Sequence, residues 1–198
     1  MGGVLIVGAM VASSLLWVSL LSGSVWLVLF FTLGCAAIGF MDDISKLHHG
    51  KGIRGKRKLA YQVGLGLVFV LIIMALIESF TMSIRVGEIF EYTFTTVVFP
   101  FFKEAVYDLK WLYLIFAVLV LVGASNAVNL TDGLDGLAIG SVAVVVLTYM
   151  VFSYLAGHAE FARYLQIPYV SGSGELTVFL SAVAGACLGF LLILKAQF

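Results

Sequence analysis

Long apolar runs separated by short polar segments dominate the chain. Six such runs are nearly free of charged residues and cover about residues 3–21, 25–41, 59–77, 111–128, 137–155 and 176–194. A helix that crosses the hydrocarbon core of a bilayer needs about 20 residues. These runs are apolar on all sides, unlike the one-sided helices that lie on the surface of soluble proteins. The pattern therefore predicts about six transmembrane helices.

The composition also indicates a membrane protein. The chain has 198 residues, of which 62% are hydrophobic and 11% are charged, and its mean hydropathy is +1.13. Soluble domains are about half apolar and a quarter charged, so a soluble enzyme, a disordered segment and a nucleic-acid-binding protein are excluded. The sequence shows no internal repeat, and residues 1–198 are predicted to form a single transmembrane domain.

The charges in the connections predict the orientation of the chain. Segment 42–58 holds six of the eleven basic residues, and basic connections remain in the cytoplasm. Segment 78–110 carries five acidic and three basic residues, which suits the opposite side. Within it, residues 83–90 alternate in polarity around Gly87, as in a β-hairpin. We therefore predict an all-α integral membrane protein with a small extracytoplasmic β-hairpin, and segments 42–58 and 129–136 on the cytoplasmic face.

Two acidic residues end the second apolar run. A carboxylate at the bilayer centre costs about 2.5–3.5 kcal/mol on insertion scales, so Asp42 and Asp43 are expected at the cytoplasmic interface. If the helix continues, Lys46 lies one turn further along the same face. An ordinary polar flank with an ion pair on the helix surface is the alternative interpretation of this cluster.

A second polar cluster follows the fourth run. It contains Asn126, Asn129, Asp132 and Asp135 together with two glycines, which indicates a bent loop whose backbone approaches a ligand. Asp135 could instead cap the fifth helix. Capping accounts for one acid, but not for two acids and two asparagines at a membrane boundary. The cluster is therefore a candidate binding site.

Both clusters are predicted to lie beside the basic segment on one face of the membrane. Mg²⁺ commonly bridges one or two carboxylates to substrate phosphates, and lysine or arginine neutralises phosphate charge as it shifts during transfer. A site rich in oxygen and free of thiols disfavours zinc and copper. These residues predict phosphoryl chemistry at a membrane surface.

The two clusters also carry a resemblance. Residues 129–138, Asn-Leu-Thr-Asp-Gly-Leu-Asp-Gly-Leu-Ala, and the earlier Asp42-Asp43 pair resemble the phospho-N-acetylmuramoyl-pentapeptide-transferase family. This family lies within the polyprenyl-phosphate N-acetylhexosamine-1-phosphate transferase superfamily. Residues 1–3, 51–52, 58–62, 167–169, 174–176 and 185–190 resemble other family segments, so the resemblance covers nearly the whole chain.

The resemblance implies an activity in peptidoglycan synthesis, and thereby in cell wall biogenesis, cell shape and cell division. The reaction would transfer phospho-N-acetylmuramoyl-pentapeptide from its UDP carrier to undecaprenyl phosphate, giving lipid I and UMP with Mg²⁺ as cofactor. The enzyme would be a multi-pass protein of the bacterial cytoplasmic (inner) membrane, with its active site on the cytoplasmic face. A homodimer is also expected as a possible oligomeric state.

The resemblance also implies roles for individual residues. Asp42 and Asp43 would be catalytic, activating the lipid phosphate or holding the metal. Substrate-binding roles would fall to Asn126, Asn129, Asp132, Asp135, Lys51 and Lys58. We expect direct attack by the lipid phosphate, because the acceptor is already anionic and mainly needs positioning and charge screening.

The chain lacks segments that members of this family contain. Family members continue into a Phe-Met-Gly-Asp motif and a histidine-rich loop, and neither is present in the sequence. At the other end, Met1 stands inside the family segment that residues 1–3 resemble. The chain is therefore expected to be truncated at both ends and to be a partial glycosyl-phosphate transferase domain. Alone it is expected to be inactive, and Mg²⁺-dependent UMP release by the purified protein would contradict this expectation.

Two alternatives remain open from the sequence. A related transferase could load N-acetylglucosamine-1-phosphate onto a polyprenyl phosphate, and competition between the two UDP-sugar donors would separate these activities. From another class, the chain could be a non-catalytic membrane fragment or a transporter-like protein. Transporters commonly show internal symmetry and charges within the membrane, whereas the acids here cluster at one interface.

Overall fold

The computed structural model describes residues 2–19, 21–79, 84–86, 90–92, 95–99, 102–131 and 136–196. Within these ranges the helices are α1 (Gly2–Trp17), α2 (Gly23–His49), α3 (Gly55–Ser79), α4 (Leu112–Thr131), α5 (Leu137–Gly157), α6 (Ala159–Leu165) and α7 (Ser173–Ala196). The strands are β1 (Ile84–Val86), β2 (Phe90–Tyr92), β3 (Thr96–Phe99) and β4 (Phe102–Asp108). The predicted mainly helical fold is confirmed.

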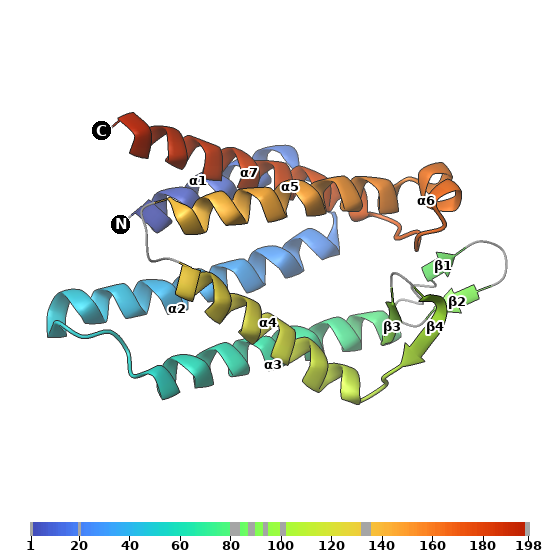
Figure 1. The fold of residues 1–198 in the computed structure, drawn as a ribbon, viewed down its shortest axis with the longest axis horizontal. Helices are drawn as coiled ribbons and strands as arrows, with labels where there is room; N and C mark the ends of the chain where they lie inside the picture. Colours follow the sequence, from blue (N-terminus) through green and yellow to red (C-terminus); the bar gives the residue numbers. More distant parts are fainter. Residues whose placement is uncertain are drawn as a thin grey trace.

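The long helices run roughly along the longest axis of the molecule, α4 obliquely to the others, with the strands and α6 at one end (Figure 1). Five described helices, namely α2, α3, α4, α5 and α7, are long and apolar enough to cross a membrane, and α1 is a shorter apolar helix. The prediction of about six spans therefore corresponds to five long helices and one of 16 residues.

The first helix ends earlier than the apolar run predicts. It stops at Trp17, and the backbone N–H of Ser19 donates to the carboxylate Oε2 of Glu175 at 2.9 Å. Because this carboxylate lies in the first turn of α7, the bond turns the chain away from the helix direction. The apolar run alone carries no information about this distant acceptor.

The predicted hairpin is confirmed. β1 pairs antiparallel with β2, with Arg85 opposite Glu91. A second antiparallel pair, β3 with β4, was not predicted from the sequence. The three consecutive apolar residues of β3, Val97, Val98 and Phe99, lack the alternation that identifies a half-buried strand.

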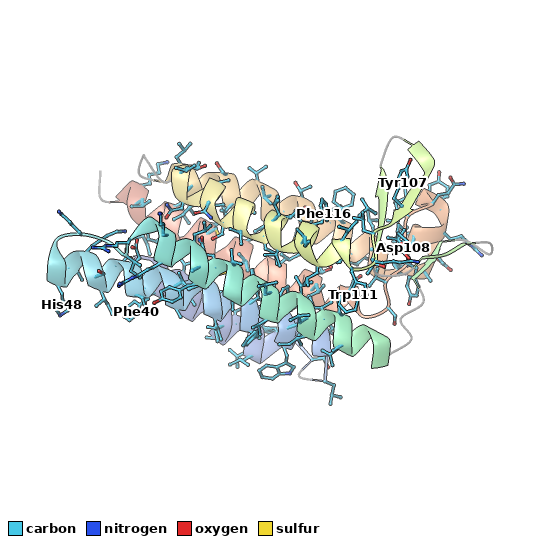
Figure 2. All side chains as sticks on the ribbon, turned by 90° about the horizontal axis from the view of Figure 1, so that it is seen from below. Phe40, His48, Tyr107, Asp108, Trp111 and Phe116 are labelled. Carbon is cyan, nitrogen blue, oxygen red and sulfur yellow. The ribbon has the colours of Figure 1, made fainter. Side chains whose placement is uncertain are left out.

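Apolar side chains cover the outside of the helices. Leu119 and Leu192, for example, are 68% and 69% exposed, and lipid is the solvent that such a surface requires. A buried cluster of Met10, Val25 and Phe179 joins α1, α2 and α7. Figure 2 places His48 at one end of the bundle and Tyr107, Asp108 and Trp111 at the other. Aromatic side chains at a helix end are typical of membrane interfaces.

Candidate functional site

The candidate site lies at the end of the bundle opposite the strands. The last turns of α2, the first turn of α3, the last turn of α4 and the first turn of α5 meet at this end (Figure 1). The two segments that the sequence analysis singled out, 42–58 and 126–136, meet where Lys58 of α3 contacts Asn129 of α4. Direct contacts join them, as the following distances show.

Asp42 is the buried centre of the polar network. Its side chain is 9% exposed, and its Oδ2 lies 2.8 Å from Lys46 Nζ and 3.8 Å from Lys58 Nζ. Its Oδ1 accepts a hydrogen bond from the backbone N–H of Ile53 at 2.8 Å. Two ammonium groups and an N–H stabilise the ionised carboxylate against the loss of water. Asp42 is thus an anion that holds two cations in place.

Asp43 has a different environment. Its side chain is 69% exposed, and its Oδ1 lies 3.2 Å from Lys46 Nζ. The predicted pairing of Lys46 with the acidic pair is confirmed for both acids. An exposed ion pair contributes little to stability, so Asp43 remains available to a ligand from solvent.

The basic loop after α2 folds back over Asp42. The helix ends at Gly50, which has φ +66° and donates its N–H to the carbonyl of Lys46, a common helix-terminating conformation for glycine. The Ser45 hydroxyl then donates to the carbonyl of Lys51 at 3.1 Å. The Lys51 side chain is exposed, so it can reach a ligand in front of the site while its backbone is held.

Gly52 permits the close approach of the loop to Asp42. A Cβ atom at this position would lie 2.7 Å from Asp42 Oδ1, closer than a van der Waals contact. The loop must therefore carry glycine here if Ile53 is to donate to the carboxylate. The resemblance singled out this glycine, and the structure gives its physical reason.

Gly52→Ala is expected to push the loop away from Asp42 and break the bond from Ile53. Loss of one hydrogen bond to a charged group predicts a destabilisation of about 1.5–3 kcal/mol. Thermal unfolding and the rate of trypsin cleavage after Arg54 measure the two effects. Gly55→Ala is the matched control, because nothing lies within 4 Å of a Cβ there. Equal behaviour of the two variants would contradict this account of Gly52.

Lys58 connects the two halves of the site. Its Nζ donates to Asn129 Oδ1 at 2.9 Å, and its side chain is 18% exposed. Asp42 in α2, Lys58 in α3 and Asn129 in α4 thus form a continuous polar chain. The predicted grouping of these three residues agrees with the structure, and their roles toward substrate stay predictions.

A second layer of polar contacts lies one turn deeper in the bundle. Gln62 is 8% exposed, its Nε2 donates to Ser125 Oγ at 3.0 Å, and its Oε1 accepts from Asn126 Nδ2 at 2.9 Å. Asn126 therefore contacts another helix of the protein. Gln62 and Ser125 were missing from the sequence-based site. A glutamine inside the apolar run 59–77 was the signal that could have identified them.

A cavity of about 470 Å³ opens beside Asn129. Its lining residues come from α1, α4, α5, α7 and the residue before α5: Gly3, Ile6, Ser125, Val128, Asn129, Gly136, Ala138, Ile139, Phe190 and Leu194. Asp132 and Asp135 lie outside the described residues. The residue at the N-cap position of α5 is Gly136, and the alternative of Asp135 as the cap of this helix falls outside the described residues.

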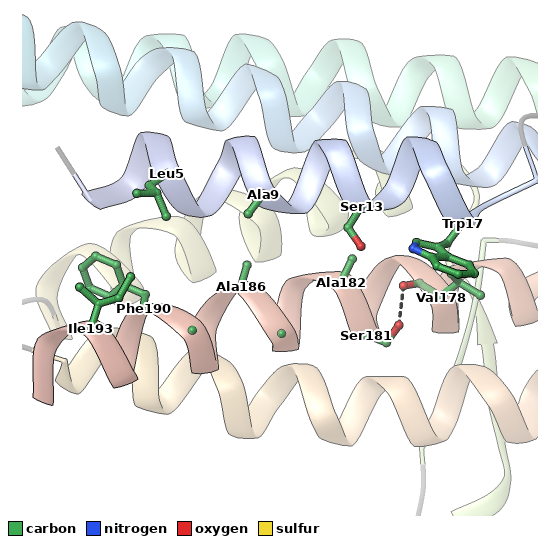
Figure 3. A pocket seen from close by; sticks show the side chains of 12 residues that line it. Leu5, Ala9, Ser13, Trp17, Val178, Ser181, Ala182, Ala186, Phe190 and Ile193 are labelled. Atoms are coloured by element: carbon green, nitrogen blue, oxygen red, sulfur yellow. Dashed lines mark hydrogen bonds between the residues drawn. The ribbon is translucent and has the colours of Figure 1, made fainter. Parts of the chain in front are cut away.

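A larger cavity of about 760 Å³ lies between α1 and α7. Figure 3 shows small side chains such as Ala9 and Ala186 facing it, with Trp17 at one end and Ile193 at the other. Its lining contains no charged residue. None of the described candidate site residues lines this cavity, whereas Asn129 lines the smaller one.

The two described carboxylates of the site differ in how well they could hold a magnesium ion. Within the described residues, no group of three or more His, Cys, Asp or Glu side chains gathers to hold a metal. Both oxygens of Asp42 already accept from protein donors, whereas Asp43 is largely exposed. Mg²⁺ is often held by one carboxylate together with substrate phosphates, and Asp43 fits that requirement.

The sequence is similar to those of several known proteins. The sequence is 47% identical over 193 residues to a phospho-N-acetylmuramoyl-pentapeptide-transferase of Syntrophus aciditrophicus. It is 46% and 45% identical to proteins of the same name from Pelobacter propionicus and Desulfovibrio desulfuricans. Each match covers 96% of this chain and 50% of the relative, so the chain spans about half the length of these relatives. Residues 25–193 match glycosyl transferase family 4, and the chain therefore belongs to this family of membrane transferases.

Proposed function

We propose that this chain forms part of the active site of an enzyme that transfers phospho-N-acetylmuramoyl-pentapeptide from its UDP carrier to undecaprenyl phosphate. The products are lipid I and UMP. The observation that carries the proposal is the contact chain from Asp42 through Lys58 to Asn129. It joins the two motif segments at one end of a bundle of apolar helices, where a lipid phosphate and a water-soluble nucleotide can meet.

The reaction joins two anions, so its main requirements are position and charge screening. An oxygen of the lipid phosphate attacks the phosphorus attached to the sugar, a new P–O bond forms, and the bond to the UMP phosphate breaks. Lys58 and the exposed Lys51 are suited to contact phosphate oxygens. Asp42, held by three donors, orients the lysines and does not need to accept a proton.

Mg²⁺ is the proposed cofactor, and it would neutralise phosphate charge when bound. Asp43 is the described carboxylate best placed to hold it, because the oxygens of Asp42 already have partners. Asp132 and Asp135, from the same family motif, are proposed to complete the nucleotide site beside Asn129. The basic character of segment 42–58 supports placing this site on the cytoplasmic face.

The test exchanges matching halves between relatives. In a chimera, this chain replaces the 193 matching residues of the Syntrophus aciditrophicus protein. The chimera is supplied with undecaprenyl phosphate, Mg²⁺ and equal concentrations of UDP-N-acetylmuramoyl-pentapeptide and UDP-N-acetylglucosamine. We expect the lipid product to carry muramoyl-pentapeptide. Preferential transfer of N-acetylglucosamine phosphate would support the related transferase, and a folded chimera that forms no lipid product would contradict the proposal.

A further inference from the structure

Hydrogen bonds join Gln62 of α3 to Ser125 and Asn126 of α4, and the chemistry of the partners fixes which atom donates at each contact. Gln62 lies four residues after Lys58, and Ser125 lies four residues before Asn129. The Gln62 contacts therefore lie directly below the contact between Lys58 and Asn129. Because Gln62 is only 8% exposed, protein partners rather than water satisfy its amide group.

The starting point is the backbone carbonyl of Val122, which can only accept. The side-chain atom of Asn126 that lies 2.8 Å from it must therefore be Nδ2. The same Nδ2 lies 2.9 Å from Gln62, so the Gln62 atom there is the acceptor Oε1. The Gln62 NH₂ group must then face Ser125 Oγ, at 3.0 Å. Amide orientation follows from the partners, and here it makes the Ser125 oxygen an acceptor.

The hydroxyl hydrogen of Ser125 must consequently point to another group. Several other helical hydroxyls donate to a carbonyl three or four residues earlier, namely those of Thr32, Thr131, Ser141, Thr148 and Ser181. Ser125 makes no such bond, and within the described ranges no residue accepts its hydrogen. Ser125 does line the cavity of about 470 Å³, so this cavity is where the hydrogen can find an acceptor.

Asn129, like Ser125, has a hydrogen-bond donor that is not used by the described residues of the neighbouring helix. The ammonium group of Lys58 can only donate, so the Asn129 atom that faces it at 2.9 Å is Oδ1, and the NH₂ group is directed away from Lys58. Asn129 lines the same cavity as Ser125, whose other side chains are apolar. Ser125 and Asn129 therefore both present hydrogen-bond donors to the cavity. A ligand atom that binds to them must be a hydrogen-bond acceptor.

We propose that Ser125 is a substrate-binding residue whose hydroxyl donates to a carbonyl or phosphate oxygen in this cavity. Gln62 is the positioning residue, because its NH₂ group occupies the Ser125 oxygen and turns the hydroxyl hydrogen toward the ligand. The choice of ligand rests on the proposed function. The acceptor oxygen belongs either to the uridine nucleotide or to the lipid phosphate, and the binding experiment distinguishes these sources.

The first measurement needs no ligand. In NMR spectra of the purified chain in nanodiscs, the side-chain NH₂ protons of Gln62 are expected to show cross-peaks to the β protons of Ser125. The NH₂ protons of Asn126 are expected to exchange slowly with water. Cross-peaks from the Gln62 NH₂ group to Asn126 in place of Ser125 would reverse the polarity and overturn the proposal.

The second measurement is ligand affinity, with UMP and undecaprenyl phosphate titrated separately into the same chain. Ser125→Ala and Gln62→Met are each expected to weaken binding of one of these ligands about fivefold, as loss of one hydrogen bond predicts. The double variant should bind no more weakly than either single variant, because Gln62 acts through Ser125. The ligand that loses affinity identifies the source of the acceptor oxygen.

Controls separate this inference from general damage and from the proposed function. Ser141→Ala removes a hydroxyl that donates to its own helix, and Gln166→Met makes the same change outside the site; both should leave affinity unchanged. If Gln62→Met does not fold, Ser125→Ala and the NMR cross-peaks still decide. Unchanged affinity in Ser125→Ala, additive losses in the double variant, or no binding of either ligand would overturn the inference. Lipid product formation by the chimera tests the function separately.

Discussion

Asp42→Asn is expected to lower the rate of lipid product formation by the chimera at least about 100-fold, as removal of a single preorganised electrostatic contact does in other enzymes. Asp42 is the anion shared by Lys46 and Lys58. A neutral amide of the same shape can still accept from Ile53, but it cannot hold two ammonium groups. The lysines then lose the orientation that directs them toward phosphate oxygens.

The control for this variant is Glu160→Gln, which removes a carboxylate from α6 at the other end of the bundle. It should retain the full rate. Thermal unfolding of both variants shows whether a lower rate is caused by unfolding of the protein. An Asp42→Asn chimera that is folded and keeps more than about a tenth of the rate, a loss of only about 1.4 kcal/mol in transition-state stabilisation, would contradict the role of Asp42.

Lys58→Met is expected to have the second largest effect, a loss of about 30-fold or more in kcat/KM, as removal of one partner from a desolvated charge pair predicts. Lys58 is 18% exposed and joins Asp42 to Asn129. Methionine keeps most of the side-chain volume but removes the charge and the donor. Both the screening of phosphate and the link between α3 and α4 should be lost.

Lys56→Met is the matched control, because Lys56 lies two residues earlier in the same basic segment and is exposed. It changes the net charge of the chain by the same amount and should leave kcat/KM within about twofold, since exposed charges interact weakly. Equal losses in the two variants would show that the segment acts only through its total charge. Lys58→Arg should fall between them, because guanidinium keeps the charge but not the geometry.

The spans and the polar clusters at their ends could be predicted from the sequence because the interior of a bilayer excludes charged residues. A run of about 20 apolar residues indicates a helix that spans the bilayer. Acidic residues such as Asp42 and Asp43 at the end of such a run indicate a candidate functional site. The pairing of both acids with Lys46 also followed from helical spacing alone.

Other features depended on contacts between distant segments and could not be predicted in this way. The end of α1 depends on a bond from Ser19 to Glu175, 156 residues away. The burial of Asp42 depends on a loop that returns over it through Gly52. Gln62 and Ser125 are 63 residues apart, and neither belongs to an acidic or basic cluster, so charge patterns could not identify them.

The central claim is that the contact chain through Asp42 and Lys58 is one functional unit of a transferase site. A double-mutant cycle on lipid product formation by the chimera, with Asp42→Asn, Lys58→Met and the combined variant, tests it most directly. Residues that act as a unit show strongly non-additive effects. We expect the combined variant to be no slower than the slower single variant. A rate loss equal to the product of the two single losses would contradict it.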